Sequence, residues 1–237
     1  MTDVYTPPPP PPPAPPPATR GFDFVRPFAF AFEDPRWLPK MLIGGVFMLA
    51  SIFIIGGIFV MGYLARLMRN VIGGVTAPLP EWDDLGDYFA EGLRLFGVAL
   101  LYMLPIFVIA MAAIIPAAIA GSFRQEEIRQ LGGGLAGCVW CLVVPLSLAL
   151  SVWVPAALLF AVVEQNFAAG FNFRRIWDFI KGNVGNYILA VVVFIVARFA
   201  AGFGVILFCV GVFITVFWSM VVGAYAIADV YRLSSTK

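Results

Sequence analysis

Five long apolar runs dominate the pattern of hydrophobic and polar positions along this chain. Each is long enough to cross a bilayer as an α-helix, which takes about 20 mainly apolar residues. We therefore predict an all-α fold: a polytopic transmembrane helical bundle of about five spans, with amphipathic helices at its surface. The predicted spans are residues 41–64, 95–120, 135–163, 186–208 and 212–231.

The boundary between the fourth and fifth spans can be placed in two ways. A break at Gly211 gives both helices a spanning length but leaves Arg198 near the middle of the membrane, whereas a break at Gly202 and Gly204 ends the fourth helix near Arg198. We favour the first, because a long apolar helix can offset the insertion cost of about 2.5–3.5 kcal/mol for a central arginine. Arg198 is then a candidate functional residue, with Glu164 as its candidate partner. The alternative is that Arg198 extends to the interface.

Acidic side chains gather only in residues 79–96, LPEWDDLGDYFAEGLRLF. We interpret this stretch as an amphipathic helix at the membrane surface, with Pro80 at its first helical position. On such a helix Asp83, Asp87 and Glu91 share one face. The opposite face carries apolar side chains: Trp82, Leu85, Phe89, Leu93 and Phe96.

The acidic residues suggest two hypotheses. Asp83, Asp87 and Glu91 could bind a divalent cation as a carboxylate cluster, or they could form a solvated face that complements the helix dipole. We favour the solvated face, because the spacing lacks the loop pattern of an EF-hand. Together with Trp82 and Asp84, these three residues are our candidate functional residues in the stretch.

A second amphipathic helix is predicted at residues 172–182. Its apolar stripe contains Phe173, Ile176, Trp177 and Ile180, and its polar face contains Arg174, Arg175, Asp178 and Lys181. Basic and aromatic side chains of this kind suit the headgroup region of a bilayer. We predict that Trp37, Trp177, Arg174 and Arg175 are interfacial residues that contact membrane lipids.

Composition supports the membrane interpretation and narrows the chemistry. The 237 residues are 61% hydrophobic and 12% charged, whereas average globular chains are about 45–50% apolar and about 25% charged. A net charge of +1 gives no reason to expect nucleic-acid binding. Histidine is absent, which removes the commonest general base and metal ligand. Cys138 and Cys141 have CxxC spacing but lie in an apolar run without further ligands. We therefore predict no metal, no cofactor and no enzymatic activity.

The ends of the chain differ from the apolar region. Residues 1–21 contain the tract PPPPPPPAPPP, which favours an extended, disordered tail. We predict a membrane domain at residues 22–232 and a short tail at residues 233–237. Basic residues are nearly balanced between the two sides of a five-span bundle, so charge does not decide the orientation. The tail lacks an apolar leader, and we expect a cytoplasmic N-terminus. If the first span instead folds back at Gly56-Gly57, both Trp-Asp segments lie on the cytoplasmic face.

Three phrases resemble a family of uncharacterised prokaryotic membrane proteins, the domain of unknown function 4013 family. They are FEDPRW at residues 32–37, Gly62-Tyr63 with Arg66 and Arg69, and LPEWDD at residues 79–84 followed by Gly86-Asp87. The resemblance covers about Phe22 to Arg232. It implies a multi-pass protein in the cell membrane of a prokaryote, and it brings no activity and no catalytic residues.

Three functions remain open from the sequence. We predict a non-enzymatic structural or accessory component of a membrane complex, with other membrane-protein subunits or a second copy as partners. The alternative is a transporter or channel subunit that uses Arg198 and spans kinked at Pro105, Pro116, Pro145 and Pro155. The third is a lipid-modifying enzyme that uses the acids between Asp83 and Glu91.

Overall fold

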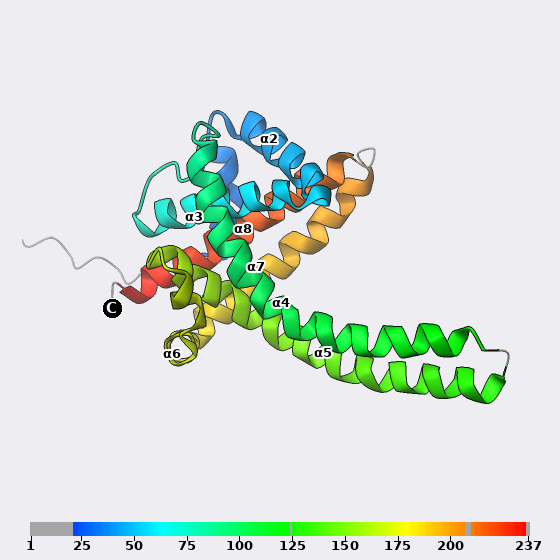
Figure 1. The fold of residues 1–237 in the computed structure, drawn as a ribbon. Coiled ribbons are helices and arrows are strands. Elements are labelled where there is room, and N and C mark those ends of the chain that lie inside the picture. Colours follow the sequence, from blue (N-terminus) through cyan, green and yellow to red (C-terminus); the bar gives the residue numbers. More distant parts are fainter. Residues whose placement is uncertain (1–20, 124, 207–209, 236–237) are drawn as a thin grey trace, which may run out of the picture.

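The computed structural model describes residues 21–123, 125–206 and 210–235, and every regular element within these ranges is a helix (Figure 1). Five helices are long and apolar enough to cross a membrane, namely α3, α4, α5, α7 with η4, and α8. The prediction of an all-α polytopic bundle is confirmed. The elements in chain order are α1 (Arg26–Ala29), η1 (Phe30–Glu33), α2 (Trp37–Ala50), η2 (Ser51–Phe53), α3 (Ile55–Ile72), α4 (Leu85–Gly121), α5 (Glu126–Val163), η3 (Phe167–Phe171), α6 (Phe173–Gly182), α7 (Val184–Gly202), η4 (Phe203–Ile206) and α8 (Val210–Ser235). The proline tract falls in residues 1–20, outside the described residues.

The first apolar run folds back on itself, so the prediction of one span over residues 41–64 was wrong. Helices α2 and α3 meet at Ile54, whose φ of 68° turns the chain. Gly56 makes the tight turn feasible, because a Cβ there would lie 2.1 Å from the carbonyl oxygen of Phe47. The hairpin alternative is therefore correct, but the turn lies at residues 51–54, and Gly56 and Gly57 already belong to α3. Helix α3 continues to Ile72, so that Arg66 and Arg69 lie in its last turns.

The break before the last helix lies earlier than the preferred division at Gly211. Helix α7 ends at Gly202, η4 follows, and Gly211 already belongs to α8. The hydroxyl of Thr215 donates to the carbonyl oxygen of Ala201 at 2.8 Å. A Cβ at Gly204 would lie 2.1 Å from that hydroxyl oxygen. The close approach of η4 to α8 therefore needs a glycine at position 204.

Helix α8 is the centre of the bundle. It contacts α2, α3, α5 and α7, and its buried side chains face them on several sides: Phe217, Val221, Val222, Ala224, Tyr225, Ala226, Ile227, Ala228 and Val230. A helix that is apolar on all faces needs neighbours on all faces. The other helices therefore pack around α8.

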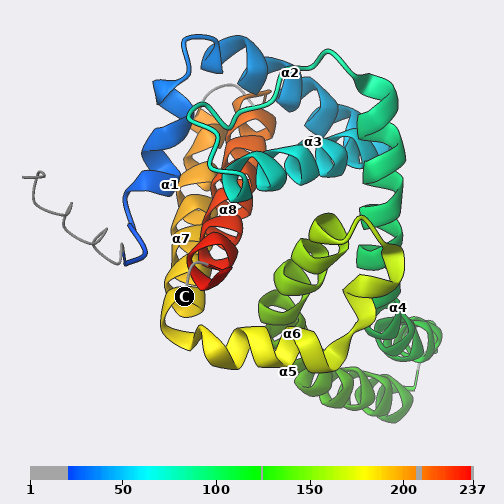
Figure 2. The same ribbon diagram turned by 90° about the vertical axis from the view of Figure 1, so that its left-hand side faces the viewer.

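Three reversals of chain direction bring the polar segments to one end of the molecule (Figures 1 and 2). Helices α2 and α3, α4 and α5, and α7 and α8 each form a helical hairpin. The segment 73–84, helix α6 and the C-terminal end of α8 consequently lie at the same end. Figure 2 shows α6 running across this end between α5 and α7.

Helices α4 and α5 extend far beyond the rest of the bundle as a two-helix arm (Figure 1). With 37 and 38 residues, each is about 55 Å long at 1.5 Å per residue. Pro105, Pro116, Pro145 and Pro155 lie inside these helices. We call residues 103–149 the α4–α5 hairpin. Most of its large apolar side chains are exposed, as they are on surfaces that lipid or other helices cover.

The contact between α3 and α4 depends on two glycines. A Cβ at Gly62 would lie 1.9 Å from the carbonyl oxygen of Tyr88, and a Cβ at Gly92 would lie 1.8 Å from that of Ile58. Neither backbone oxygen can move without moving a helix. Close approach of this kind is how small residues hold membrane helices together.

We expect Gly92→Ala to lower the free energy of unfolding by about 1–3 kcal/mol, because the added methyl group forces α3 and α4 apart. Thermal unfolding of the purified chain in mild detergent measures the change. The matched control is Gly133→Ala, where a Cβ meets nothing within 4 Å. The control should keep or slightly raise stability, and equal melting temperatures for the two variants would contradict the close-contact interpretation.

Candidate functional site

The acidic stretch is a loop followed by a helix, and not the helix that we predicted from Pro80. Pro78 and Pro80 lack an N–H and hold the preceding residues in extended conformations, so α4 begins only at Leu85. The side chain of Asp84 caps α4 by accepting the backbone N–H of Asp87 at 3.2 Å. Asp83 lies before the helix and therefore does not share a face with Asp87 and Glu91.

Four consecutive carbonyl oxygens of this loop, from residues 78 to 81, each accept a hydrogen bond from a different side chain. Asn70 Nδ2 donates to Pro78 at 2.9 Å, and Lys40 Nζ donates to Leu79 at 3.0 Å. The Tyr63 hydroxyl donates to Pro80 at 3.1 Å, and the Tyr88 hydroxyl donates to Glu81. Because the donors come from α2, α3 and α4, the loop is fastened to three helices at once.

Lys40 is the most buried charge in this arrangement. Its Nζ lies 2.6 Å from Asp34 Oδ2 and 2.7 Å from Glu81 Oε1, and the Lys40 and Asp34 side chains are 5% and 7% exposed. An ammonium group has three donors, and these two carboxylates with the Leu79 carbonyl oxygen occupy all three. We call Asp34, Lys40 and Glu81 the Lys40 cluster. Its lysine has no donor left to bind or protonate a substrate, so the cluster serves structure.

Trp82 lies beside the Lys40 cluster in a stack of aromatic rings. Its ring packs face to face with Tyr63 at 4.3 Å and with Phe47 at 4.8 Å. Its indole N–H donates to the carbonyl oxygen of Lys40 at 3.1 Å. A tryptophan with both faces covered and its donor satisfied is an anchor, and it fixes the loop against α2 and α3.

Most acidic residues of the stretch pair with bases from other elements. Glu81 also lies 2.8 Å from Arg36. Arg66 lies 3.9 Å from Asp84, and Arg69 lies 2.6 Å from Glu91. The favoured solvated face therefore describes only Asp83 and Asp87, which are exposed. Among the described residues, no group of three or more His, Cys, Asp or Glu side chains is arranged to hold a metal ion.

Residues from elsewhere in the sequence complete the site, and sequence reasoning missed Lys40 and Tyr63 among them as site residues. Lys40 opens an apolar run, and nothing local pairs it with Glu81, 41 positions later. Tyr63 belongs to the phrase Gly62-Tyr63 with Arg66 and Arg69. These residues share one role in the structure, because Tyr63, Arg66 and Arg69 all bind the stretch that contains LPEWDD. The phrases that resembled one family thus meet at one place.

Arg198 lies one turn before the end of α7, and not near the centre of a span. Its guanidinium donates to the hydroxyl of Ser219 at 3.4 Å and lies 5.7 Å from the ring centre of Phe194. Its expected partner Glu164 pairs with Arg175 instead. In the described part of the chain no acid forms an ion pair with Arg198, and its position fits a side chain that extends to the interface.

The second amphipathic helix forms as predicted, as α6. Ile176 and Phe179 are buried, whereas Phe173 and Trp177 are exposed and pack beside Trp153. Arg175 pairs with Glu164 and lies over the ring of Phe160. Arg174 is exposed on α6. Trp37, the other predicted interfacial tryptophan, lies at the start of α2. It packs edge-on against Phe32, with ring centres 4.9 Å apart.

Cys138 and Cys141 lie exposed on α5 within the α4–α5 hairpin, and both are free thiols. The neighbouring residues of the hairpin are apolar, as expected, but the two cysteine side chains are not buried against other parts of the protein.

The fold and this site define an all-α polytopic membrane protein whose loop between α3 and α4 is fixed by charges and aromatic rings. The family model described as "Protein of unknown function (DUF4013)" matches residues 45–210. The chain therefore belongs to that family, as the resemblance implied. The match is narrower than the expected range of Phe22 to Arg232, and it leaves out the phrase FEDPRW. Comparisons with curated proteins and with solved structures found no match.

We expect Lys40→Met to lower the free energy of unfolding by about 3–5 kcal/mol, because it leaves the buried carboxylate of Asp34 without its partner. Thermal or denaturant unfolding in mild detergent measures the loss. Lys181→Met is the matched control, since the Lys181 ammonium is exposed over the Trp177 ring and should contribute less than about 1 kcal/mol. Similar losses for the two variants would show that the Lys40 cluster does not hold the fold.

We also expect a defined dependence of stability on pH. Burial raises the pKa of Asp34, but the hydrogen bonds from Lys40 and from the Arg36 N–H outweigh it, so this pKa lies below its ordinary value. The unfolded chain therefore binds the proton first, and stability present at neutral pH is lost as pH falls below about 4 toward the folded pKa. Melting temperatures between pH 7 and pH 3 should fall less steeply for Asp34→Asn than for the unmodified chain. Parallel curves would contradict the assignment.

Proposed function

We propose that this protein is a non-enzymatic structural or accessory component of a membrane complex, and that the α4–α5 hairpin is its contact element. The observation that carries the proposal is the contrast between two parts of the molecule. At the Lys40 cluster the charged side chains pair with one another and with the loop backbone. Along the hairpin, by contrast, large apolar side chains point away from the protein.

One face of α5 supports contact with another helix. Gly133, Gly137 and Cys141 recur at intervals of four residues and therefore lie on one face. A Cβ at Gly133 or Gly137 would meet nothing within 4 Å, whereas the corresponding position at Gly62 or Gly92 is filled by a neighbouring helix. Small residues at this spacing let a second transmembrane helix approach closely. The occupant is a helix of another subunit or of a second copy.

The orientation follows from the charges at the end that holds the Lys40 cluster, and we propose that this end faces the cytoplasm of a prokaryotic cell. Basic residues near the ends of spans favour the cytoplasmic side. Among the described residues, the opposite end carries Arg198 near the end of α7 and Arg129 near the start of α5. The cluster end carries Arg26, Arg36, Lys40, Arg66, Arg69, Arg174, Arg175, Lys181 and Arg232.

Transport is the second candidate, because a cavity of about 310 Å³ lies between the spans. Residues from α2, η2, α3, α4, α5, α7 and α8 line it, including Met61, Met68, Pro155 and Met220. Ser51 and Ser151 are the polar side chains in its lining. Such a cavity suits an apolar molecule and offers little to coordinate an ion or a sugar.

We expect Gly137→Leu to weaken assembly about tenfold without unfolding the chain. A Cβ at Gly137 meets nothing within 4 Å, and leucine has a higher helix propensity than glycine, but its bulk blocks close approach of a second helix. Tagged purification in mild detergent with mass spectrometry should recover about tenfold less partner, which lies within the 1–2 kcal/mol typical of such helix contacts.

Gly185→Leu is the control, since a Cβ at Gly185 also meets nothing within 4 Å but lies on α7, outside the hairpin. It should leave assembly unchanged. Recovery of the unmodified chain as a monomer without partners would contradict the proposal, and solute uptake by reconstituted monomer would favour transport.

A further inference from the structure

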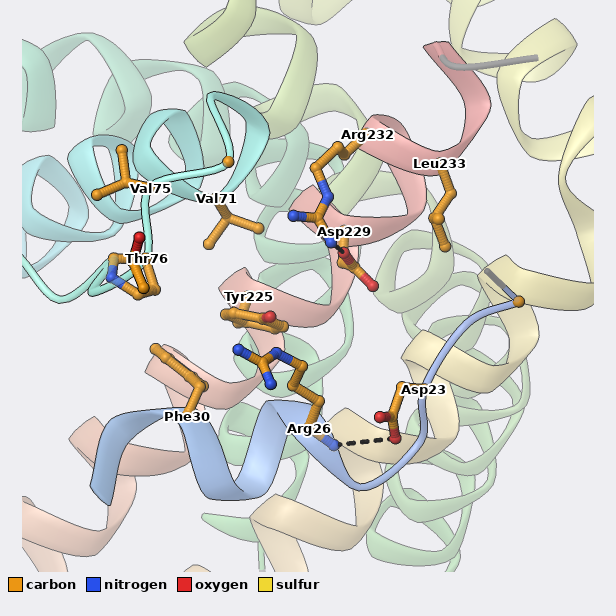
Figure 3. A pocket seen from close by; sticks show the side chains of 13 residues that line it. Asp23, Arg26, Phe30, Val71, Val75, Thr76, Tyr225, Asp229, Arg232 and Leu233 are labelled. Atoms are coloured by element: carbon orange, nitrogen blue, oxygen red, sulfur yellow. Dashed lines mark hydrogen bonds and ion pairs between the residues drawn. The ribbon is translucent and has the colours of Figure 1, made fainter. Parts of the chain in front are cut away.

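A polar cavity of about 690 Å³ lies at the end of the molecule that holds the Lys40 cluster (Figure 3). The segment before α1, the end of α3 with the loop after it, and the last turns of α8 form its wall. Its volume is in the range of about 300–1,000 Å³ that is usual for small-molecule sites. No residue of α4 or α5 lines it, so the cavity is independent of the proposed hairpin contact.

The basic side of the cavity is formed by Arg26 and Arg232. Figure 3 shows the Arg26 guanidinium beside the ring of Tyr225, and the Arg232 guanidinium beside Asp229 on the other side of that ring. Tyr225 is itself held by stacking on Phe30, with ring centres 4.2 Å apart. Arg26 lies 3.6 Å from Glu33 and interacts with the hydroxyl of Tyr225, but a guanidinium has five donors. A guanidinium fork fixed in this way matches two oxygens of a phosphate group.

The acidic side is formed by Asp229 and Asp23. Asp229 is 6% exposed, and its Oδ1 accepts from Arg232 at 2.6 Å. Asp23 uses its Oδ1 to accept the backbone N–H groups of Val25 and Arg26, at 2.9 and 3.2 Å. An ionised carboxylate has about four acceptor sites on two oxygens, so both acids have acceptor capacity beyond these bonds.

The lining balances in charge, because it contains two arginines and two aspartates, of which Arg232 and Asp229 already form an ion pair. A ligand with a single sign of charge would be attracted by one side and repelled by the other. A ligand that carries both signs, a few bonds apart, satisfies both. The rest of the wall is mainly apolar and includes Phe30, Val71, Val75 and Leu233. It lies at the end of the bundle where charged residues adjoin the membrane-spanning helices.

We propose that this cavity binds a phosphate joined to a primary amine by a short linker, the headgroup chemistry of phosphatidylethanolamine. The phosphate lies at Arg26 and Arg232, and the ammonium group lies at Asp229 and Asp23. A primary ammonium has three N–H donors for the carboxylates, whereas the quaternary ammonium of phosphatidylcholine has none. The apolar wall accommodates the glycerol and the first methylenes of a lipid.

The test uses the full chain in mild detergent with phosphatidylethanolamine, phosphatidylcholine and phosphatidylglycerol of identical acyl chains. Native mass spectrometry and thermal shift report binding. We expect phosphatidylethanolamine to bind about tenfold more tightly than either other lipid, the effect of one or two hydrogen bonds between charged groups. Soluble O-phosphoethanolamine separates the two sources of this chemistry. Binding as tight as that of the lipid identifies a free solute, and much weaker binding identifies the lipid.

Two variants test the contacts to the ammonium group and to the phosphate group separately. Asp23→Asn keeps an oxygen for the N–H groups at the start of α1 but removes the charge, and it should bring the affinity for phosphatidylethanolamine close to that for phosphatidylcholine. Arg26→Gln should weaken both lipids by a similar factor, because both contain the phosphate. Asp87→Asn removes an exposed charge outside the cavity and should change neither. Equal affinity of the unmodified chain for all three lipids, or equal effects of Asp23→Asn and Asp87→Asn, would overturn the proposal.

Discussion

The burial of one ammonium group is the constraint on which the rest of this structure depends. A charge removed from water costs several kcal/mol unless it is paired and hydrogen-bonded. Lys40 meets this cost with two carboxylates and one carbonyl oxygen. These three partners come from the bend before α2 and from the loop between α3 and α4, segments far apart in the sequence. Their positions are therefore fixed relative to each other wherever the chain is folded.

The same constraint explains how an irregular loop can lie against membrane helices. Near a bilayer, an unsatisfied backbone carbonyl is costly because little water is present to bind it. Residues 78–81 avoid this cost because Asn70, Lys40, Tyr63 and Tyr88 each donate to one of their carbonyl oxygens. With Trp82 stacked beside them, these contacts make the loop a rigid part of the bundle. The described residues of the α4–α5 hairpin form no comparable set of polar contacts, and their apolar surface is left for lipid or for other helices.

The sequence predicted the architecture well because the apolar runs are long and charges are few. The sequence-based prediction was wrong where a local conformational preference was outweighed by contacts between residues far apart in the sequence. Residues 41–64 are apolar enough for one span, but Ile54 and Gly56 turn the chain so that α2 packs against α3 and α8. Helix signals after Pro80 were outweighed by four side chains that bind the loop carbonyls.

Trp82, Asp84 and Glu91 were predicted as important and lie in the site, although as anchors and ion-pair partners. Asp83 and Asp87 remain exposed. Arg198 appeared central only because the last break was placed at Gly211. Lys40 could not be found from the sequence, since neither Asp34 nor Glu81 is recognisable as its partner without the fold.

A double-mutant cycle between Lys40 and Glu81 tests the central claim most directly. Lys40→Met, Glu81→Gln and the double variant are unfolded in the same detergent, and the coupling energy is taken from the four free energies of unfolding. The account predicts a coupling of about 1 kcal/mol or more, as for residues that share one ion-pair network. Effects that add to within about 0.5 kcal/mol would show that charge does not hold the loop to α2, and would contradict the account.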